Sequence, residues 1–92
     1  MMAVRDNKQR SRFELELDGV TAFAAYRRNG SVVTFVHTEV PKALGGKGVG
    51  SALAKGALDL VRAADETIVA ECPFIAGYVE KHPELHDLRQ RP

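Results

Sequence analysis

The chain contains no tryptophan and only one cysteine among its 92 residues. A single thiol excludes an internal disulfide and any metal site built from several cysteines. The chain has 13 basic and 12 acidic residues, so its formal net charge is only +1. No global charge therefore draws the chain to nucleic acid. No apolar run approaches the roughly 20 residues of a membrane span. These absences favour a cytoplasmic protein without nucleic-acid or membrane partners.

The length and composition fit one domain with one modest core, since 45% of the residues are hydrophobic. Residues 1–11 carry Arg5, Lys8 and Arg10 among few apolar groups, and we predict a flexible basic tail there. Residues 12–88 are predicted to form the folded domain, and residues 89–92 a frayed C-terminus. We expect a monomer or a weak dimer.

Three strands are predicted in the first half of the folded part. Residues 13–17 alternate apolar and acidic side chains, as a half-buried strand does. Asp18-Gly19 and Asn29-Gly30 are tight-turn signals, because glycine accepts positive φ. Asp18-Gly19 separates the first strand from a second strand at 21–28, and Asn29-Gly30 separates the second from a longer third strand at 31–40. The three strands are predicted to form an antiparallel meander.

The second half alternates helix and strand. Residues 48–64 carry apolar side chains at helical spacing, and residues 67–70 form a short apolar run typical of a buried strand. Pro73 suits the first position of a second helix, which we expect to end near His82. The predicted order is β-β-β-α-β-α, an α+β fold. A helical crossover makes the last strand parallel to the third.

This topology brings two separated segments to one edge of the sheet. In open α/β sheets, ligands collect outside the carboxyl ends of parallel strands. His37 and Cys72 both lie at such ends. The topology therefore places His37 near Cys72, where it can accept the Cys72 proton. His37 is also predicted to share a strand face with Val33 and Phe35, so a core-edge histidine bonded to a backbone carbonyl is the alternative.

A glycine-rich turn, Gly45-Gly-Lys-Gly-Val-Gly-Ser51, joins the third strand to the first helix. Glycines let backbone amides approach a ligand without a Cβ clash, and a helix N-terminus favours phosphate. The turn is not a P-loop, since glycine rather than serine or threonine follows Lys47. Its spacing also differs from the dinucleotide fingerprint. A plain flexible connection explains the glycines equally well.

The turn resembles the acyl-CoA-binding motif of the GNAT superfamily of N-acetyltransferases. Together with segments 37–41, 72–75 and 82–85, it resembles a small single-domain GNAT-like family of predicted acetyltransferases over residues 12–88. The resemblance implies a minimal GNAT-like fold that lacks the usual N-terminal helices. One position departs from the motif: Gly45 stands where arginine or glutamine is usual.

The resemblance also implies an activity, transfer of an acetyl group from acetyl-CoA to an amine on a small molecule or a protein. It implies a catalytic Cys72, with His37 in the active site. It implies that coenzyme A pairs its pantetheine arm with the third strand and sets its pyrophosphate on the glycine turn. The residues so assigned are Glu39, Val40, Gly46, Lys47, Gly48, Val49, Gly50 and Ser51.

Several alternatives remain open. Cys72 either forms an acetyl-thioester or serves as an acid or base, and a lone cysteine is often an inert core residue. Tyr78 resembles a proton donor of such enzymes, but we favour a packing role. His82 and His86 are four apart, yet the proline between them argues against a helical metal site, and we predict no metal.

Two other functions compete with acetyl transfer. One is a non-catalytic module of the same fold that binds coenzyme A or a protein partner without turnover. The other is a thiol hydrolase that uses Cys72 and His37. The chain lacks the glycine-flanked nucleophile turn of such enzymes, which argues against this function.

Overall fold

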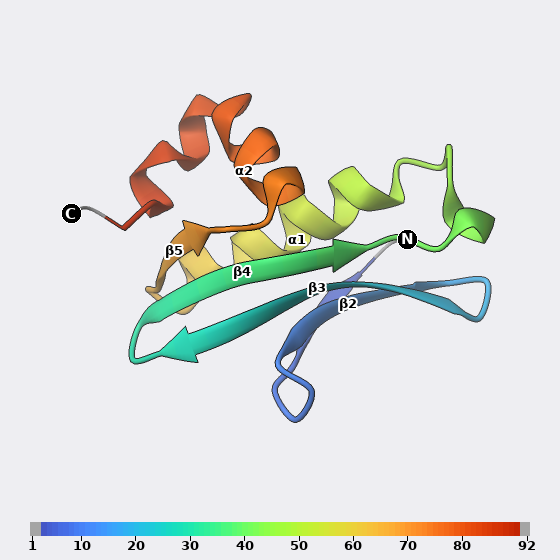
Figure 1. Ribbon diagram of the computed structural model, residues 1–92, viewed down its shortest axis with the longest axis horizontal. Coiled ribbons are helices and arrows are strands. Elements are labelled where there is room, and N and C mark those ends of the chain that lie inside the picture. Colours follow the sequence, from blue (N-terminus) through green and yellow to red (C-terminus); the bar gives the residue numbers. More distant parts are fainter. Residues whose placement is uncertain (1–2, 91–92) are drawn as a thin grey trace.

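A computed structural model describes residues 3–90 of the chain. It contains one five-stranded sheet in the order β1-β2-β3-β4-β5, with both α-helices on one side (Figure 1). The first four strands pair antiparallel and β5 pairs parallel to β4, so the predicted meander and crossover are confirmed. The elements are β1 (Val4–Asn7), β2 (Arg12–Leu17), β3 (Val20–Asn29), β4 (Val32–Glu39), η1 (Lys42–Leu44), α1 (Val49–Ala63), β5 (Thr67–Ala70), α2 (Pro73–Glu80) and η2 (Pro83–Leu88).

One hydrophobic core fills the space between the sheet and the helices. Alternate strand residues point into it, as the period-two pattern predicts. The fully buried side chains include Phe13, Leu15, Val33, Phe35, Leu53, Leu58, Val61, Ile68 and Ile75. Within residues 3–90, neither helix is long and apolar enough to cross a membrane.

The predicted flexible tail over residues 1–11 is wrong for residues 4–7, which form β1 and pair with β2. One of its charged residues, Asp6, is half-buried and has partners on another strand. The Asp6 carboxylate accepts hydrogen bonds from the Tyr26 hydroxyl at 2.5 Å and from Arg28 at 3.2 Å. These partners lie far along the chain, so local composition did not reveal them. Residues 1–2 lie outside the described part.

The predicted frayed C-terminus is also wrong for residues 89–90. Arg89 pairs with Ile68 in a parallel bridge, and the Gln90 amide donates to the Ile68 carbonyl at 2.8 Å. The segment therefore covers part of the free edge of β5. Residues 91–92 of the predicted frayed end lie outside the described part.

β1 packs against α1 at Gly56. A Cβ added at this glycine would overlap the side chain of Val4. Gly56 therefore weakens helix propensity but admits the first strand to the helix surface. The close approach explains a helical glycine that the sequence pattern left without a role.

We predict that Gly56→Ala lowers the free energy of unfolding by about 1–3 kcal/mol, because overpacking outweighs the gain in helix propensity. Gly77→Ala is the matched control, since nothing lies within 4 Å of its added Cβ. Urea denaturation of both variants measures the difference. A Gly56→Ala protein as stable as the control would contradict the packing.

Glu14 carries the one buried charge of the sheet, at 3% exposure, among residues 3–90. Burial works to raise its pKa, but hydrogen bonds from Arg12, Arg5 and Asn7 outweigh burial and hold the pKa below its usual value. The Arg5 bond measures 2.9 Å. Because the folded-state pKa is lowered, the carboxylate stabilises the fold above its unfolded-state pKa of 4.5.

This stabilisation is predicted to disappear as the pH falls through the lowered pKa of Glu14. At neutral pH, Glu14→Gln should cost about 1.5–3 kcal/mol, the range for hydrogen bonds to charged groups. Urea denaturation between pH 7 and pH 3 is the measurement. Parallel stability curves for the parent and the variant would refute a role for this carboxylate in the acid sensitivity.

Candidate active site

The ladder between β4 and β5 ends at one carbonyl. Phe35 and Ala70 form its last pair, and the amides of Glu71 and Cys72 then both donate to the Phe35 carbonyl, at 2.9 and 3.0 Å. Beyond this point β4 continues to Glu39 beside β3 alone. Within residues 3–90, the other edge of β4 therefore has no strand partner, and it can pair with an extended ligand.

A β-bulge interrupts β4 at the same place. Tyr26 pairs with Phe35 and Ala25 with His37, so Val36 is an extra residue without a partner in the ladder. An extra residue reverses the alternation of side chains that follow it. The bulge thus decides which side chains of β4 reach the helices.

The reversal corrects the predicted position of His37. His37 pairs with Ala25 and lies exposed, with its ring 6.2 Å from Phe23 in an edge-on arrangement. It does not share the face of Phe35, because the bulge lies between the two residues. His37 and Cys72 are therefore not brought together, and the predicted proton acceptance by His37 has no geometric support.

Thr38 takes the place that the sequence predicted for His37. It pairs with Ala24, a buried core residue, and its hydroxyl lies 3.2 Å from the Cys72 sulfur. Cys72 is buried, at 4% exposure, and stands at the N-cap of α2 directly before Pro73. The contact between Thr38 and Cys72 follows from the bulge, and the residue pattern of β4 gives no sign of a bulge.

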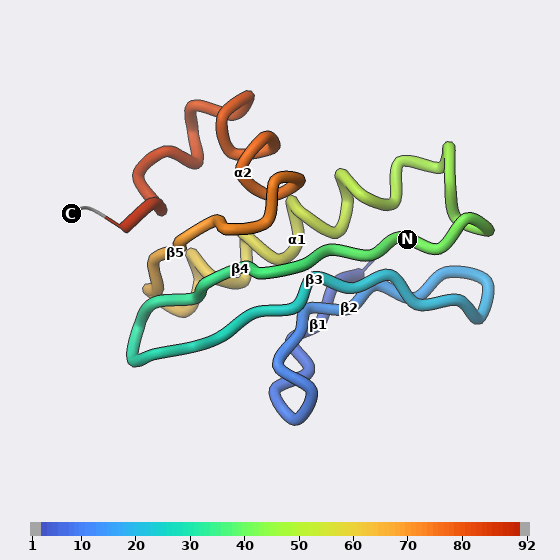
Figure 2. Tube along the Cα trace, in the orientation of Figure 1, coloured from blue at the N-terminus to red at the C-terminus, as the bar shows by residue number. Residues whose placement is uncertain are grey.

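The glycine turn leads from η1 into α1, as the tube view shows (Figure 2). Gly46 and Gly48 have φ of +76° and +72°, a region that other residues rarely adopt. A Cβ at Gly45 would lie 3.2 Å from the Lys42 carbonyl oxygen. This contact favours glycine where the motif usually has arginine or glutamine.

The first turn of α1 presents unpaired amides. The Ala52 amide makes the first intrahelical bond, to the Gly48 carbonyl at 3.0 Å, and Gly48 caps the helix without a side-chain bond. The amides of Val49, Gly50 and Ser51 therefore have no partner within the helix. The Lys47 ammonium is directed to Asp18 at 3.2 Å, an exposed pair of small energetic value.

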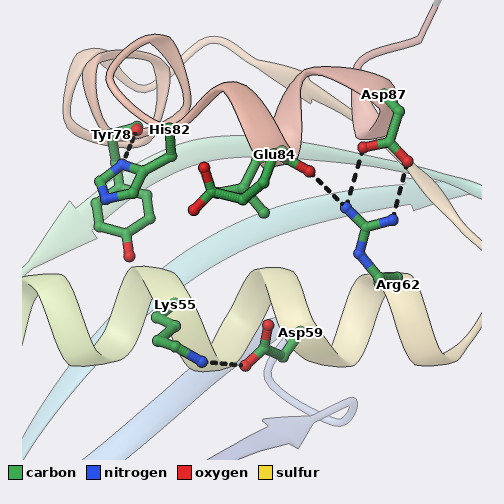
Figure 3. A pocket seen from close by; sticks show the side chains of 8 residues that line it. Lys55, Asp59, Arg62, Tyr78, His82, Glu84 and Asp87 are labelled. Atoms are coloured by element: carbon green, nitrogen blue, oxygen red, sulfur yellow. Dashed lines mark hydrogen bonds and ion pairs between the residues drawn. The ribbon is translucent and has the colours of Figure 1, made fainter.

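Two hollows lie between α1 and the segment that α2 and η2 form. Figure 3 shows the larger one, of about 680 Å³. Tyr78 and His82 stand between them and line both. Their rings stack with centroids 4.0 Å apart, and Tyr78 also packs against the core, as we predicted for it. The larger hollow is lined by Lys55, Asp59, Arg62, Tyr78, His82, Glu84, Leu85 and Asp87.

Comparison with known proteins shows which family has this arrangement. The profile of the GCN5-related N-acetyl-transferase family matches residues 12–88. Protein NATD1 of Mus musculus is 37% identical over 83 residues, which are 87% of this chain and 76% of that protein. The Homo sapiens protein of the same name is 36% identical over 83 residues, 87% of this chain and 74% of that protein.

A solved structure agrees with the sequence relatives. The solution NMR structure of a GCN5-like candidate N-acetyltransferase from Staphylococcus aureus superposes with a TM-score of 0.72 and 26% identity. The match covers 97% of this chain and 88% of that one. The chain therefore belongs to the GCN5-related N-acetyltransferase family, and its fold is the fold of that family.

Proposed function

We propose that the protein is an acetyl-CoA-dependent N-acetyltransferase that acetylates an amine acceptor. One observation carries the proposal: the unpaired edge of β4, the unpaired amides of α1 and the Cys72 thiol all lie at the same end of the sheet. Family membership supports acetyl transfer in general. The roles of individual residues rest on the geometry.

The binding surface has two parts. The pyrophosphate of coenzyme A takes the amides of the glycine turn and the first turn of α1, where positive charge of the helix dipole favours it. The pantetheine arm pairs with the main chain at the end of β4, beside Glu39 and Val40. The residues assigned to the pyrophosphate are Gly46, Lys47, Gly48, Val49, Gly50 and Ser51.

Cys72 is assigned the role of proton donor to the leaving group, the thiolate of coenzyme A. The acceptor nitrogen attacks the thioester carbonyl carbon, the carbon–sulfur bond breaks, and the thiolate of coenzyme A takes a proton from Cys72. The thiol has Thr38 beside it at 3.2 Å and no base among the described contacts, which argues against an acetyl-cysteine intermediate. The acceptor's proton then returns to Cys72 through solvent, which balances the reaction.

His37 is assigned a role with the acceptor amine rather than proton exchange with Cys72. It is exposed on the face of the sheet opposite the helices, two residues beyond the last β4–β5 pair. An amine that approaches from this face meets His37 before it meets the thioester. His37 can then receive the proton that the attacking amine loses and release it to solvent, through which Cys72 is reprotonated.

A passive binding module of the same fold is the second candidate. The separation of His37 from Cys72 favours it, because no assembled thiol–base pair exists in this conformation. Calorimetric titration with acetyl-CoA, together with a coenzyme A release assay on a panel of amines, separates the two. Binding with release supports the transferase, and binding without release supports the module. Absent binding at millimolar ligand excludes the transferase and a module that binds coenzyme A.

Cys72→Ala is predicted to keep acetyl-CoA affinity and to lower the transfer rate about 100-fold, the scale of lost general acid catalysis. Release of coenzyme A measures the rate, and calorimetry measures the affinity. Thr38→Val is the companion variant, since it removes only the hydroxyl next to the thiol. Transfer by Cys72→Ala at the parental rate would remove Cys72 from the mechanism.

Gly48→Ala is predicted to weaken acetyl-CoA binding by displacing the amides of α1. Gly30→Ala is its matched control, because Gly30 also has positive φ, at +60°, and no atom lies within 4 Å of an added Cβ at either glycine. Each should cost about 1–2 kcal/mol of stability for the left-handed backbone. Only Gly48→Ala should raise the Kd, and equal Kd values for the two variants would contradict the binding site.

A further inference from the structure

An ion pair spans β4 at the point where the β4–β5 ladder ends. Arg27 of β3 pairs with Thr34 of β4, and Thr34 pairs with Val69 of β5. The Arg27 guanidinium donates from Nη2 to the Glu71 carboxylate, directly after β5, at 3.2 Å. The Glu71 amide is one of the two that end the ladder at the Phe35 carbonyl. The ion pair therefore borders the opening between β4 and β5.

The alternation of side chains places this ion pair on the face of the sheet away from the helices (Figure 1). In β3, Tyr26 is in the core and Arg27, the next residue, is exposed. After β5, Cys72 is buried and the preceding Glu71 is exposed. His37 is exposed on the same face. A cation, an anion and an imidazole therefore share the side of the opening that the proposed function gives to the acceptor.

The ion pair can exchange its partners for a ligand. The side chains of Arg27 and Glu71 are 67% and 54% exposed, and a pair so exposed contributes little to stability. One contact joins Nη2 to Oε1. Within residues 3–90, the other guanidinium N–H groups of Arg27 and the second oxygen of Glu71 have no hydrogen-bond partner. A ligand with a cation and an anion of its own can therefore bind both side chains at small cost.

The other arginines of this face are already bonded. Arg5 and Arg12 both donate to the buried Glu14, and the Arg12 guanidinium also lies over an aromatic ring. Arg27 is thus the arginine that a ligand's anion can reach beside the opening. Glu39, exposed at the end of β4, adds a second carboxylate. The acceptor therefore meets one available guanidinium among carboxylates.

We infer that the acceptor is a free α-amino acid, with its carboxylate on Arg27 and its ammonium between Glu71 and His37. An α-amino acid has both charges on one carbon, so the two members of a single ion pair can hold it. Arginine suits the carboxylate, which it binds through two parallel N–H donors. A lysine side chain within a protein has no neighbouring carboxylate and does not match Arg27. The inference rests on the proposed function and narrows its acceptor.

The reaction balances with this acceptor. The ammonium first loses a proton to solvent, which makes the nitrogen lone pair available. The nitrogen then bonds to the acetyl carbonyl carbon, the bond from that carbon to sulfur breaks, and His37 takes the second proton. Coenzyme A leaves as a thiol with the proton of Cys72, which is replaced through solvent. The products are an N-acetyl amino acid, coenzyme A and one released proton.

The test measures coenzyme A release with the common L-amino acids, with their amides and with short peptides. For the best amino acid, kcat/KM should exceed that of its amide about tenfold, the scale of a hydrogen bond between charged groups. Simple reactivity predicts the opposite order, because the ammonium of the amide is the more acidic. A parent that prefers the amide, treats the two alike or acetylates peptides alone would overturn the inference while the proposed function remains.

Three variants locate the preference. Arg27→Ala should abolish it by raising the KM of the amino acid, with the KM of the amide and the Kd of acetyl-CoA unchanged. Lys55→Ala is the matched control, because Lys55 and Asp59 form a similarly exposed pair on α1, at 70% and 58%, and it should keep the preference. Glu71→Gln should raise the KM of the amino acid and of the amide alike.

A preference that survives in Arg27→Ala, or that disappears in Lys55→Ala, would contradict the assignment of the acceptor's carboxylate to Arg27. Calorimetric titration with acetyl-CoA keeps this result separate from the proposed function. If acetyl-CoA does not bind, or if no amine of any class releases coenzyme A, the proposed function fails and the inference fails with it.

Discussion

The carbonyl of Phe35 is the point on which the site depends. Because the amides of both Glu71 and Cys72 donate to it, the parallel ladder between β4 and β5 cannot continue. β5 turns away into α2, while β4 runs on with one edge unpaired. The same two bonds fix the backbone of Cys72 at the start of α2. An opening in the sheet, a free edge and a buried thiol thus follow from two hydrogen bonds that share one acceptor.

The bulge at Val36 assigns the side chains around this opening to two faces. Thr38 reaches the helix side and contacts Cys72, whereas His37 remains on the open side of the sheet. In the proposed function, the sheet separates a donor side, with the glycine turn and the thiol, from the face that an acceptor approaches. Such a division suits transfer between two substrates that enter from opposite faces, with the thioester held in the gap between the strands.

Local patterns predicted most of the fold. Alternation identified the strands, Asn29-Gly30 and Asp18-Gly19 identified the turns, and the order of elements required a parallel β5. What they missed depends on distant contacts. The charges of β1 looked like a solvated tail because their partners, Glu14 and Arg28, lie on other strands. The position of His37 was wrong because a bulge leaves no mark in an alternating sequence. Thr38 and the hollows between α1 and α2 were missed because they depend on how α2 packs.

Binding of acetyl-CoA at the glycine turn and at the opening between β4 and β5 is tested most directly by titrating ¹⁵N-labelled protein with acetyl-CoA and recording NMR spectra of the backbone amides. The largest shifts are expected on residues 46–51 and on residues 38–40. Amides of the β3–β4 turn, at the other end of the sheet, should remain unchanged. Shifts concentrated on β1 and β2, with the glycine turn unaffected, would show that the acyl carrier does not bind at the opening between β4 and β5.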